Sequence, residues 1–92
     1  MLRVIGDSMA PEFLDGHVIV LDPGLPAREG AFVVVESGGE MLFGCFRRDA
    51  GRDCLVPLNP QYPAHENTAS DRLVGVVIQR AGRRRADRKR YD

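Results

Sequence analysis

The feature that most constrains the fold is a series of short apolar runs, each closed by glycine, proline or another turn residue. Such boundaries favour strands, although continuous runs such as VIVL and FVVV are also compatible with a short buried helix. The runs occupy residues 17–22, 31–36, 40–48, 54–58 and 73–79. We therefore predict an all-β or β-dominated single domain, with a polar loop at residues 59–71 that Tyr62 anchors.

The composition is that of a soluble globular chain. Its 92 residues are 43% hydrophobic and 28% charged, with no apolar window of membrane-spanning length and no signal-like N-terminus. We therefore expect a cytoplasmic protein with no membrane partner. Cys45 and Cys54 are expected to be free thiols, and the scattered cysteines and histidines match no zinc pattern. No cofactor or metal is expected.

Residues 4–16, VIGDSMAPEFLDG, set Ser8 in a tight turn between the end of a strand, predicted at Val4 and Ile5, and a short helical segment. Gly6 lets the backbone turn, and Pro11 suits the first turn of a helix over residues 11–14. Asp15-Gly16 then signals a turn into the next strand. Ser8 is either a presented nucleophile or the cap of the short helix. The spacing alone leaves both interpretations open.

The segment GDSMAPEF followed by LDG resembles the serine motif of the LexA and phage-repressor C-terminal domains. The resemblance continues at Gly30, which heads a strand of the G-x-x-V-V-V type, at Glu40, and in LVPLNPQYP and LVGVVIQ. The resemblance covers nearly all of residues 4–79. The related leader-peptidase branch fits less well, because it carries a membrane anchor and a further glycine-rich box.

Members of this family are self-cleaving peptidases with a Ser–Lys dyad and a signal-peptidase-like β-fold. The resemblance implies that Ser8 is the nucleophile position and that Asp7 and Met9 line the cleft. From the residues alone, Met9 is also compatible with a place in the core, which is the interpretation favoured for Phe13.

The dyad lysine is missing. In active members it lies four residues after the acid that matches Glu40, and Gly44 occupies that position here. A serine hydroxyl needs a neighbouring base, and lysine serves only where burial keeps it neutral. Arg47 and Arg48 do not deprotonate in proteins. Losing a member of such a unit costs on the order of 10⁴ to 10⁶ in rate, so inactivity is expected.

Three other groups are candidate bases for Ser8, and each is also compatible with an ordinary surface role. His17 replaces the aspartate usual in the family and is expected to point to solvent at a strand start. His65 lies in the polar loop, and Lys89 lies in the tail. Cys45 follows Gly44, so strand alternation turns it to the opposite face as a core thiol.

The charge is unevenly distributed. Residues 80–92 contain seven Lys or Arg and two Asp, a net charge of +5, which leaves −5 on residues 1–79. We therefore expect a peptidase-fold domain at residues 1–79 and a basic, disordered tail at residues 80–92. Such a tail is also compatible with nucleic-acid binding, although only Tyr91 is available for stacking.

The leading hypothesis is a non-catalytic LexA-like domain that acts in homodimerisation and in transcriptional, SOS-type regulation. DNA contact then requires a helix-turn-helix outside this chain, or uses the basic tail weakly. Two alternatives stay open: an active serine peptidase with an unidentified base, and a nucleic-acid binder that acts through the tail.

Overall fold

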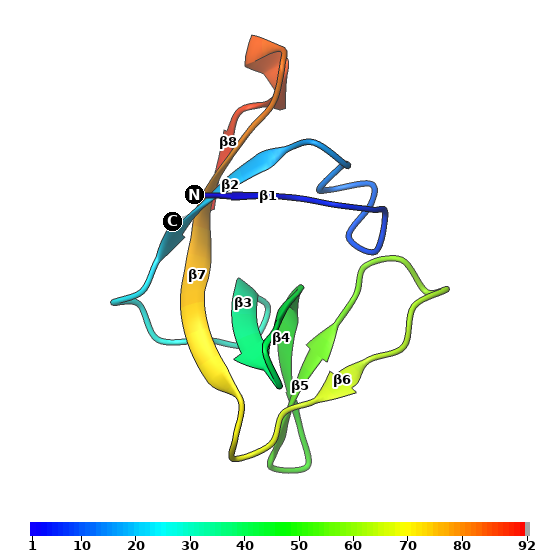
Figure 1. The fold of residues 1–92 in the computed structure, drawn as a ribbon, viewed down its shortest axis with the longest axis vertical. Helices are drawn as coiled ribbons and strands as arrows, with labels where there is room; N and C mark the ends of the chain where they lie inside the picture. Colours follow the sequence, from blue (N-terminus) through cyan, green and yellow to red (C-terminus); the bar gives the residue numbers. More distant parts are fainter. Residues whose placement is uncertain (92) are drawn as a thin grey trace.

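The computed structural model describes residues 1–91, and Asp92 lies outside the described residues. Residues 1–91 form one antiparallel sheet in the order β1-β2-β7-β3-β4-β5-β6, with β8 paired to β7. The predicted all-β class is confirmed (Figure 1). The elements are β1 (Leu2–Arg3), β2 (Val18–Asp22), β3 (Phe32–Ser37), β4 (Glu40–Asp49), β5 (Arg52–Val56), β6 (His65–Glu66), β7 (Arg72–Ala81), the 3₁₀ turn η1 (Arg85–Asp87) and β8 (Lys89–Arg90).

Strand β7 pairs with three other strands of the sheet. One of its edges pairs with β2, and the other pairs first with β3 and then, at Gln79 and Arg80, with β8. Val76 and Val77 of β7 are buried on opposite faces of the sheet, each in a different hydrophobic cluster. These two valines of β7 therefore lie in the hydrophobic core of the single chain.

Strand β3 is also buried on both faces, as its uninterrupted valines predict. Val34 joins the larger cluster, and Val33 and Val35 join the second cluster with Phe46 and Leu55. Because successive side chains of a strand point to opposite faces, one FVVV run supplies both halves of the core.

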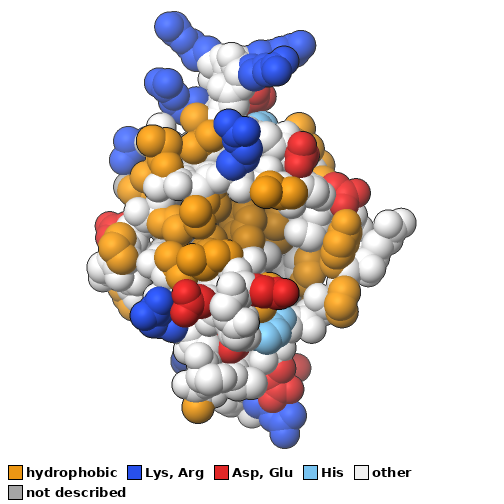
Figure 2. Space-filling model, viewed as in Figure 1, with side chains coloured by type: hydrophobic (Ala, Val, Ile, Leu, Met, Phe, Trp, Pro, Cys, Tyr) orange, Lys and Arg blue, Asp and Glu red, His pale blue; other side chains and the backbone are white. Residues whose placement is uncertain are grey.

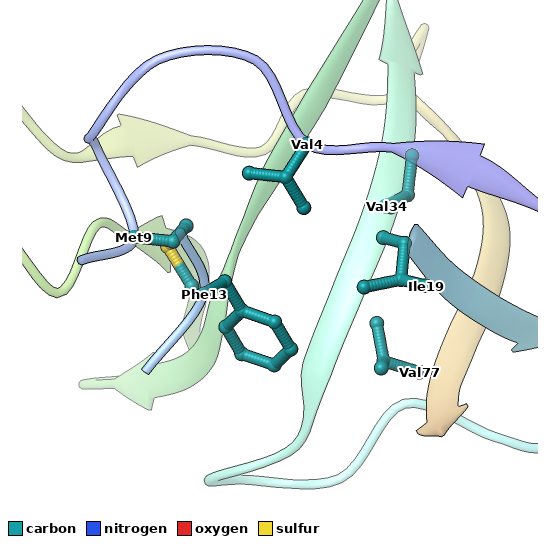
Figure 3. Close-up of a cluster of buried hydrophobic side chains, with 6 residues drawn as sticks. All are labelled: Val4, Met9, Phe13, Ile19, Val34 and Val77. Atoms are coloured by element: carbon teal, nitrogen blue, oxygen red, sulfur yellow. The ribbon is translucent and has the colours of Figure 1, made fainter. Parts of the chain in front are cut away.

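The larger cluster is built around Phe13 (Figure 3). Its side chain is fully buried beside Val4, Met9 and Ile19. The Phe13 ring also meets the rings of Phe32 and Phe43 edge to face, at centroid distances of 4.9 Å each. These geometries are the favoured ones for aromatic pairs. The prediction that Phe13 belongs to the core is confirmed.

The helix predicted at residues 11–14 is not formed. The Phe13 N–H bonds the Met9 carbonyl at 2.9 Å, which closes one turn, but the next donor leaves the helical pattern. The Leu14 N–H instead donates to Nδ1 of His17 at 2.9 Å. A side-chain acceptor therefore ends the turn where the sequence predicted a helix. The preceding strand also ends earlier than predicted, at Arg3 and not at Ile5.

The expected disorder of the basic tail is not what the structure describes for residues 80–91. This segment forms η1 and β8, and the Tyr91 N–H donates to the Ile78 carbonyl at 2.9 Å. The Tyr91 ring packs 5.3 Å from the ring of Phe13. This aromatic contact ties the end of the tail to the core, and the charge of the tail does not reveal it.

Candidate functional site

Ser8 lies in a loop whose ends are fastened together, here called the serine loop (residues 4–17). The Val4 N–H donates to the His17 carbonyl, and the Gly16 N–H donates to the Val4 carbonyl, both at 2.8 Å. The Gly6 N–H bonds Oδ1 of Asp15 at 2.7 Å. Gly6 and Gly16 have positive φ angles, which explains the glycines of the GDSM and LDG motifs.

The polar loop (residues 59–71) holds the serine loop from the other side. The Asn59 N–H donates to the Ser8 carbonyl at 3.0 Å, and its side-chain amide donates to the Asp7 carbonyl at 3.2 Å. The Tyr62 hydroxyl donates to the Asp7 carboxylate, which raises the pKa of Tyr62. Tyr62 therefore ties the polar loop to the serine loop, as an anchor should.

Ser8 faces a largely apolar groove with a volume of 410 Å³. Its apolar surface lies near the centre of the face shown in Figure 2. The walls include Ile5, Leu55 and Tyr62, and His65 lies at the same groove. Met9 does not line the groove. It is fully buried in the core, where it packs with Phe13 beneath the serine loop.

Gly44 is buried in β4, opposite Val33 of β3. A Cβ atom at Gly44 would lie 3.1 Å from Cβ of Leu55 and 3.3 Å from the Val56 nitrogen. Strand β5 therefore packs closely against the position where the resemblance places the dyad lysine. Leu55 is also one of the residues that line the groove.

The Ser8 hydroxyl forms no hydrogen bond with any side chain of residues 1–91. Two of the three candidate bases lie elsewhere. His17 is 8% exposed, not solvent-facing as expected, because its Nδ1 accepts from the Leu14 N–H. Lys89 donates to the Glu12 carboxylate at 2.9 Å. Neither residue lines the groove that contains Ser8.

His65 is the candidate base that shares the groove with Ser8. Its Nε2 lies 2.7 Å from Oδ2 of Asp71, whose side chain is only 4% exposed. Hydrogen bonds from the Ser37 hydroxyl and from His65 lower the pKa of Asp71 to about 2. The ionised carboxylate therefore fixes one edge of the imidazole ring. The structure brings His65 and Ser8 to one groove without a hydrogen bond between them.

A hydrogen-bond network around Glu12 has no signal in the sequence. Its carboxylate accepts from Lys89 Nζ at 2.9 Å, from Arg80 Nη1 at 3.1 Å and from the Tyr91 hydroxyl at 2.6 Å. The hydrogen bonds from Tyr91 and Lys89 lower the pKa of Glu12, and burial together with Glu12 raises the pKa of Tyr91. All three donors lie more than 60 residues away in sequence, so local spacing does not reveal the network.

Other predicted features are placed as follows. Cys45 is buried and Cys54 is partly buried, both as free thiols, and the hairpin pairs them with Val56 and Arg47 respectively. Among residues 1–91 there is no cluster of three or more His, Cys, Asp or Glu suited to a metal ion. That part of the chain also has no helix long and apolar enough to span a membrane.

Most of the chain is similar to known proteins. The family described as Peptidase S24-like matches residues 1–78. Repressor protein C2 of Salmonella phage P22 is 43% identical over 83 residues, covering 84% of this chain and 38% of the repressor.

Two further relatives have related names. The HTH-type transcriptional regulator for conjugative element R391 of Providencia rettgeri is 40% identical over 85 residues, covering 85% of this chain and 40% of the regulator. The LexA repressor of Paracidovorax citrulli is 36% identical over 64 residues, or 68% of this chain and 29% of the repressor. The chain thus spans no more than about two fifths of these three relatives. The chain belongs to the Peptidase S24-like family.

Proposed function

We propose that this chain is a non-catalytic regulatory domain of a transcriptional repressor of the phage-repressor and LexA type. The observation that carries the proposal is the pair of positions Ser8 and Gly44. Ser8 has no side-chain hydrogen-bond partner among the described residues, and Gly44 has no side chain at the position of the dyad lysine. Without a base, the serine hydroxyl is a poor nucleophile.

The groove itself is retained. Ser8 is fixed through its own carbonyl by Asn59, and Ile5, Leu55 and Tyr62 form apolar walls. Such a groove suits an apolar, extended peptide segment that is bound without being cleaved. In this proposal the domain acts in the cytoplasm as a homodimer. The names of the relatives, which are repressors and transcriptional regulators, support the regulatory part.

The test is covalent labelling of Ser8 by a serine-reactive fluorophosphonate, measured by intact-protein mass. We expect no labelling of the wild type above that of Ser8→Ala. Gly44→Lys should raise the labelling rate on the order of 10²-fold, within the range of general-base catalysis. Gly44→Ala is the matched control, because it adds the Cβ atom that contacts Leu55 but no amine. Wild-type labelling that vanishes in Ser8→Ala would refute the proposal.

The same experiment decides the alternative function, a serine peptidase that uses His65 as its base. The observation in its favour is that His65, paired with Asp71, lies at the groove that contains Ser8. A histidine oriented by a carboxylate is a sound base for serine. This alternative requires that the wild type is labelled and that His65→Gln abolishes the labelling. His17→Gln is the matched control, because His17 does not line the groove.

Self-association is a separate part of the proposal and has its own measurement. The chain mass is 10.2 kDa, so sedimentation equilibrium should report a mass near twice that value. A mass near 10.2 kDa at concentrations up to about 100 µM, which corresponds to binding weaker than about −5.5 kcal/mol, would refute the homodimer.

A further inference from the structure

The C-terminal arm (residues 80–91) projects from the end of the molecule opposite the β4–β5 hairpin (Figure 1). It leaves the sheet at the end of β7, turns through η1 and returns as β8. Lys and Arg side chains gather on this projection (Figure 2). The arm lies beyond residue 78, where the family match ends, so the family does not account for it.

The arm is a folded structure with internal fastenings. Arg80 Nε donates to the Asp87 carbonyl at 2.7 Å, and the Arg84 N–H donates to Oδ2 of Asp87 at 3.1 Å. Asp87 packs so closely on Gly82 that a Cβ there would lie 2.5 Å from Oδ2. Where the arm leaves the sheet, Arg80 and Lys89 bind the Glu12 carboxylate of the serine loop. The arm therefore presents its surface residues in a defined arrangement.

Six of the seven basic residues of the arm fall into two groups. Arg80 and Lys89 donate to Glu12 and are used within the molecule. Arg83, Arg84, Arg85 and Arg88 are exposed, and none of the four forms an ion pair with a carboxylate of residues 1–91. Four neighbouring like charges repel one another, and a negatively charged partner relieves that repulsion.

We propose that these four arginines form a surface that binds the phosphate backbone of double-stranded DNA. The guanidinium group matches phosphate geometry with paired donors, and all four residues are arginine. The tip carries no exposed aromatic side chain for stacking on unpaired bases, because Tyr91 packs against Phe13 and Phe32. A duplex backbone therefore fits better than a single strand. This choice of partner rests on the proposed role in transcriptional regulation.

Backbone binding of this kind is independent of sequence and steeply dependent on salt. Four neutralised phosphates predict a slope of log affinity against log salt of about −3.6, so affinity should fall about 150-fold between 50 and 200 mM salt. In a repressor, such contacts add affinity and orientation, while base-specific contacts come from elsewhere.

The test is fluorescence anisotropy of a labelled 30-base-pair duplex titrated with the full chain at several salt concentrations. The arm variant replaces Arg83, Arg84, Arg85 and Arg88 by Gln, which lowers the formal net charge from 0 to −4. We expect it to lose at least tenfold in affinity at 50 mM salt and to have a slope close to zero.

The matched control makes the same change in charge at four other exposed arginines, Arg28, Arg47, Arg52 and Arg72. It should retain affinity within about threefold and keep most of the salt slope. If both variants lost the same affinity for the duplex, overall charge would account for the loss, and the proposal would be overturned. Thermal unfolding of both variants checks that the fold is intact.

Two further probes decide the partner. A single strand of the same length should bind more weakly than the duplex, and stronger single-strand binding would overturn the duplex assignment. Polyglutamate binding in the absence of duplex binding would assign the arm to an acidic protein and overturn the proposal, as would binding to neither. None of these outcomes affects Ser8 labelling or the mass of the dimer, so failure of the arm and failure of the proposed function are distinguishable.

Discussion

Ser8 and Glu12 lie four residues apart in the serine loop, yet their side chains have opposite surroundings. The Glu12 carboxylate receives hydrogen bonds from Arg80, Lys89 and Tyr91. The Ser8 hydroxyl receives none from the described residues and faces an apolar groove. The hydrogen bonds of Glu12 therefore help to hold the loop in place, and none of them involves the Ser8 hydroxyl.

The strongest way to disturb both halves of this comparison is Phe13→Ala. Phe13 is fully buried beneath the loop and contacts Phe32, Phe43 and Tyr91. Removing the ring should lower the free energy of unfolding by about 3–5 kcal/mol, measured by urea denaturation. Phe13→Leu, which keeps most of the volume, should cost clearly less. A loss below about 1 kcal/mol for the alanine variant would contradict the central place given to this ring.

Glu12→Gln tests the structural half alone. It removes the negative charge from a network in which the Arg80 side chain is only 14% exposed. We expect a loss of about 1–2 kcal/mol in the free energy of unfolding, because Arg80 keeps its charge without a counter-ion. Glu36→Gln is the control, since its partner Arg72 is 74% exposed and the pair should contribute less than about 1 kcal/mol. Equal effects of the two variants would contradict this account.

The same network predicts a dependence on pH. The pKa of Glu12 is lowered in the folded state, so its contribution is complete above its ordinary pKa of 4.5 and is lost as pH falls through the folded value. Asp71 behaves likewise, with a loss between about pH 4 and pH 2. The melting temperature of Glu12→Gln should therefore vary less with pH below 4.5 than that of the wild type. Parallel profiles would show that Glu12 is not the group responsible.

The smallest effect belongs to Ser8→Ala. Because the hydroxyl has no hydrogen-bond partner among residues 1–91, its removal should change the free energy of unfolding by less than about 0.5 kcal/mol. Urea denaturation beside Glu12→Gln measures the contrast directly. A loss above about 1 kcal/mol would mean that the hydroxyl is bonded in solution, and would remove the difference between the two residues.

Much of the fold was predictable from the sequence because strand boundaries coincide with glycine, proline and turn residues. The double burial of β3, the core position of Phe13 and the turns at Gly6 and Gly16 all follow from local patterns. The position of Gly44 in β4 also agrees with the strand expected from Glu40 onward.

What the sequence could not supply were contacts between distant segments. The arm is held by its hydrogen bonds to Glu12 and by the packing of Tyr91 on Phe13, which are far apart in sequence. The meeting of His65 and Ser8 at one groove depends on how the polar loop folds back. Charge and periodicity along the chain do not encode these pairings, because each requires the tertiary fold.

The central claim is that the Ser8 site holds a hydroxyl without a base that activates it. The most direct measurement is incubation of the wild type and of Ser8→Ala with a complex peptide mixture, followed by mass spectrometry of newly formed termini. The account predicts that the two digests are indistinguishable at neutral and alkaline pH. New termini that form with the wild type and disappear with Ser8→Ala would contradict it.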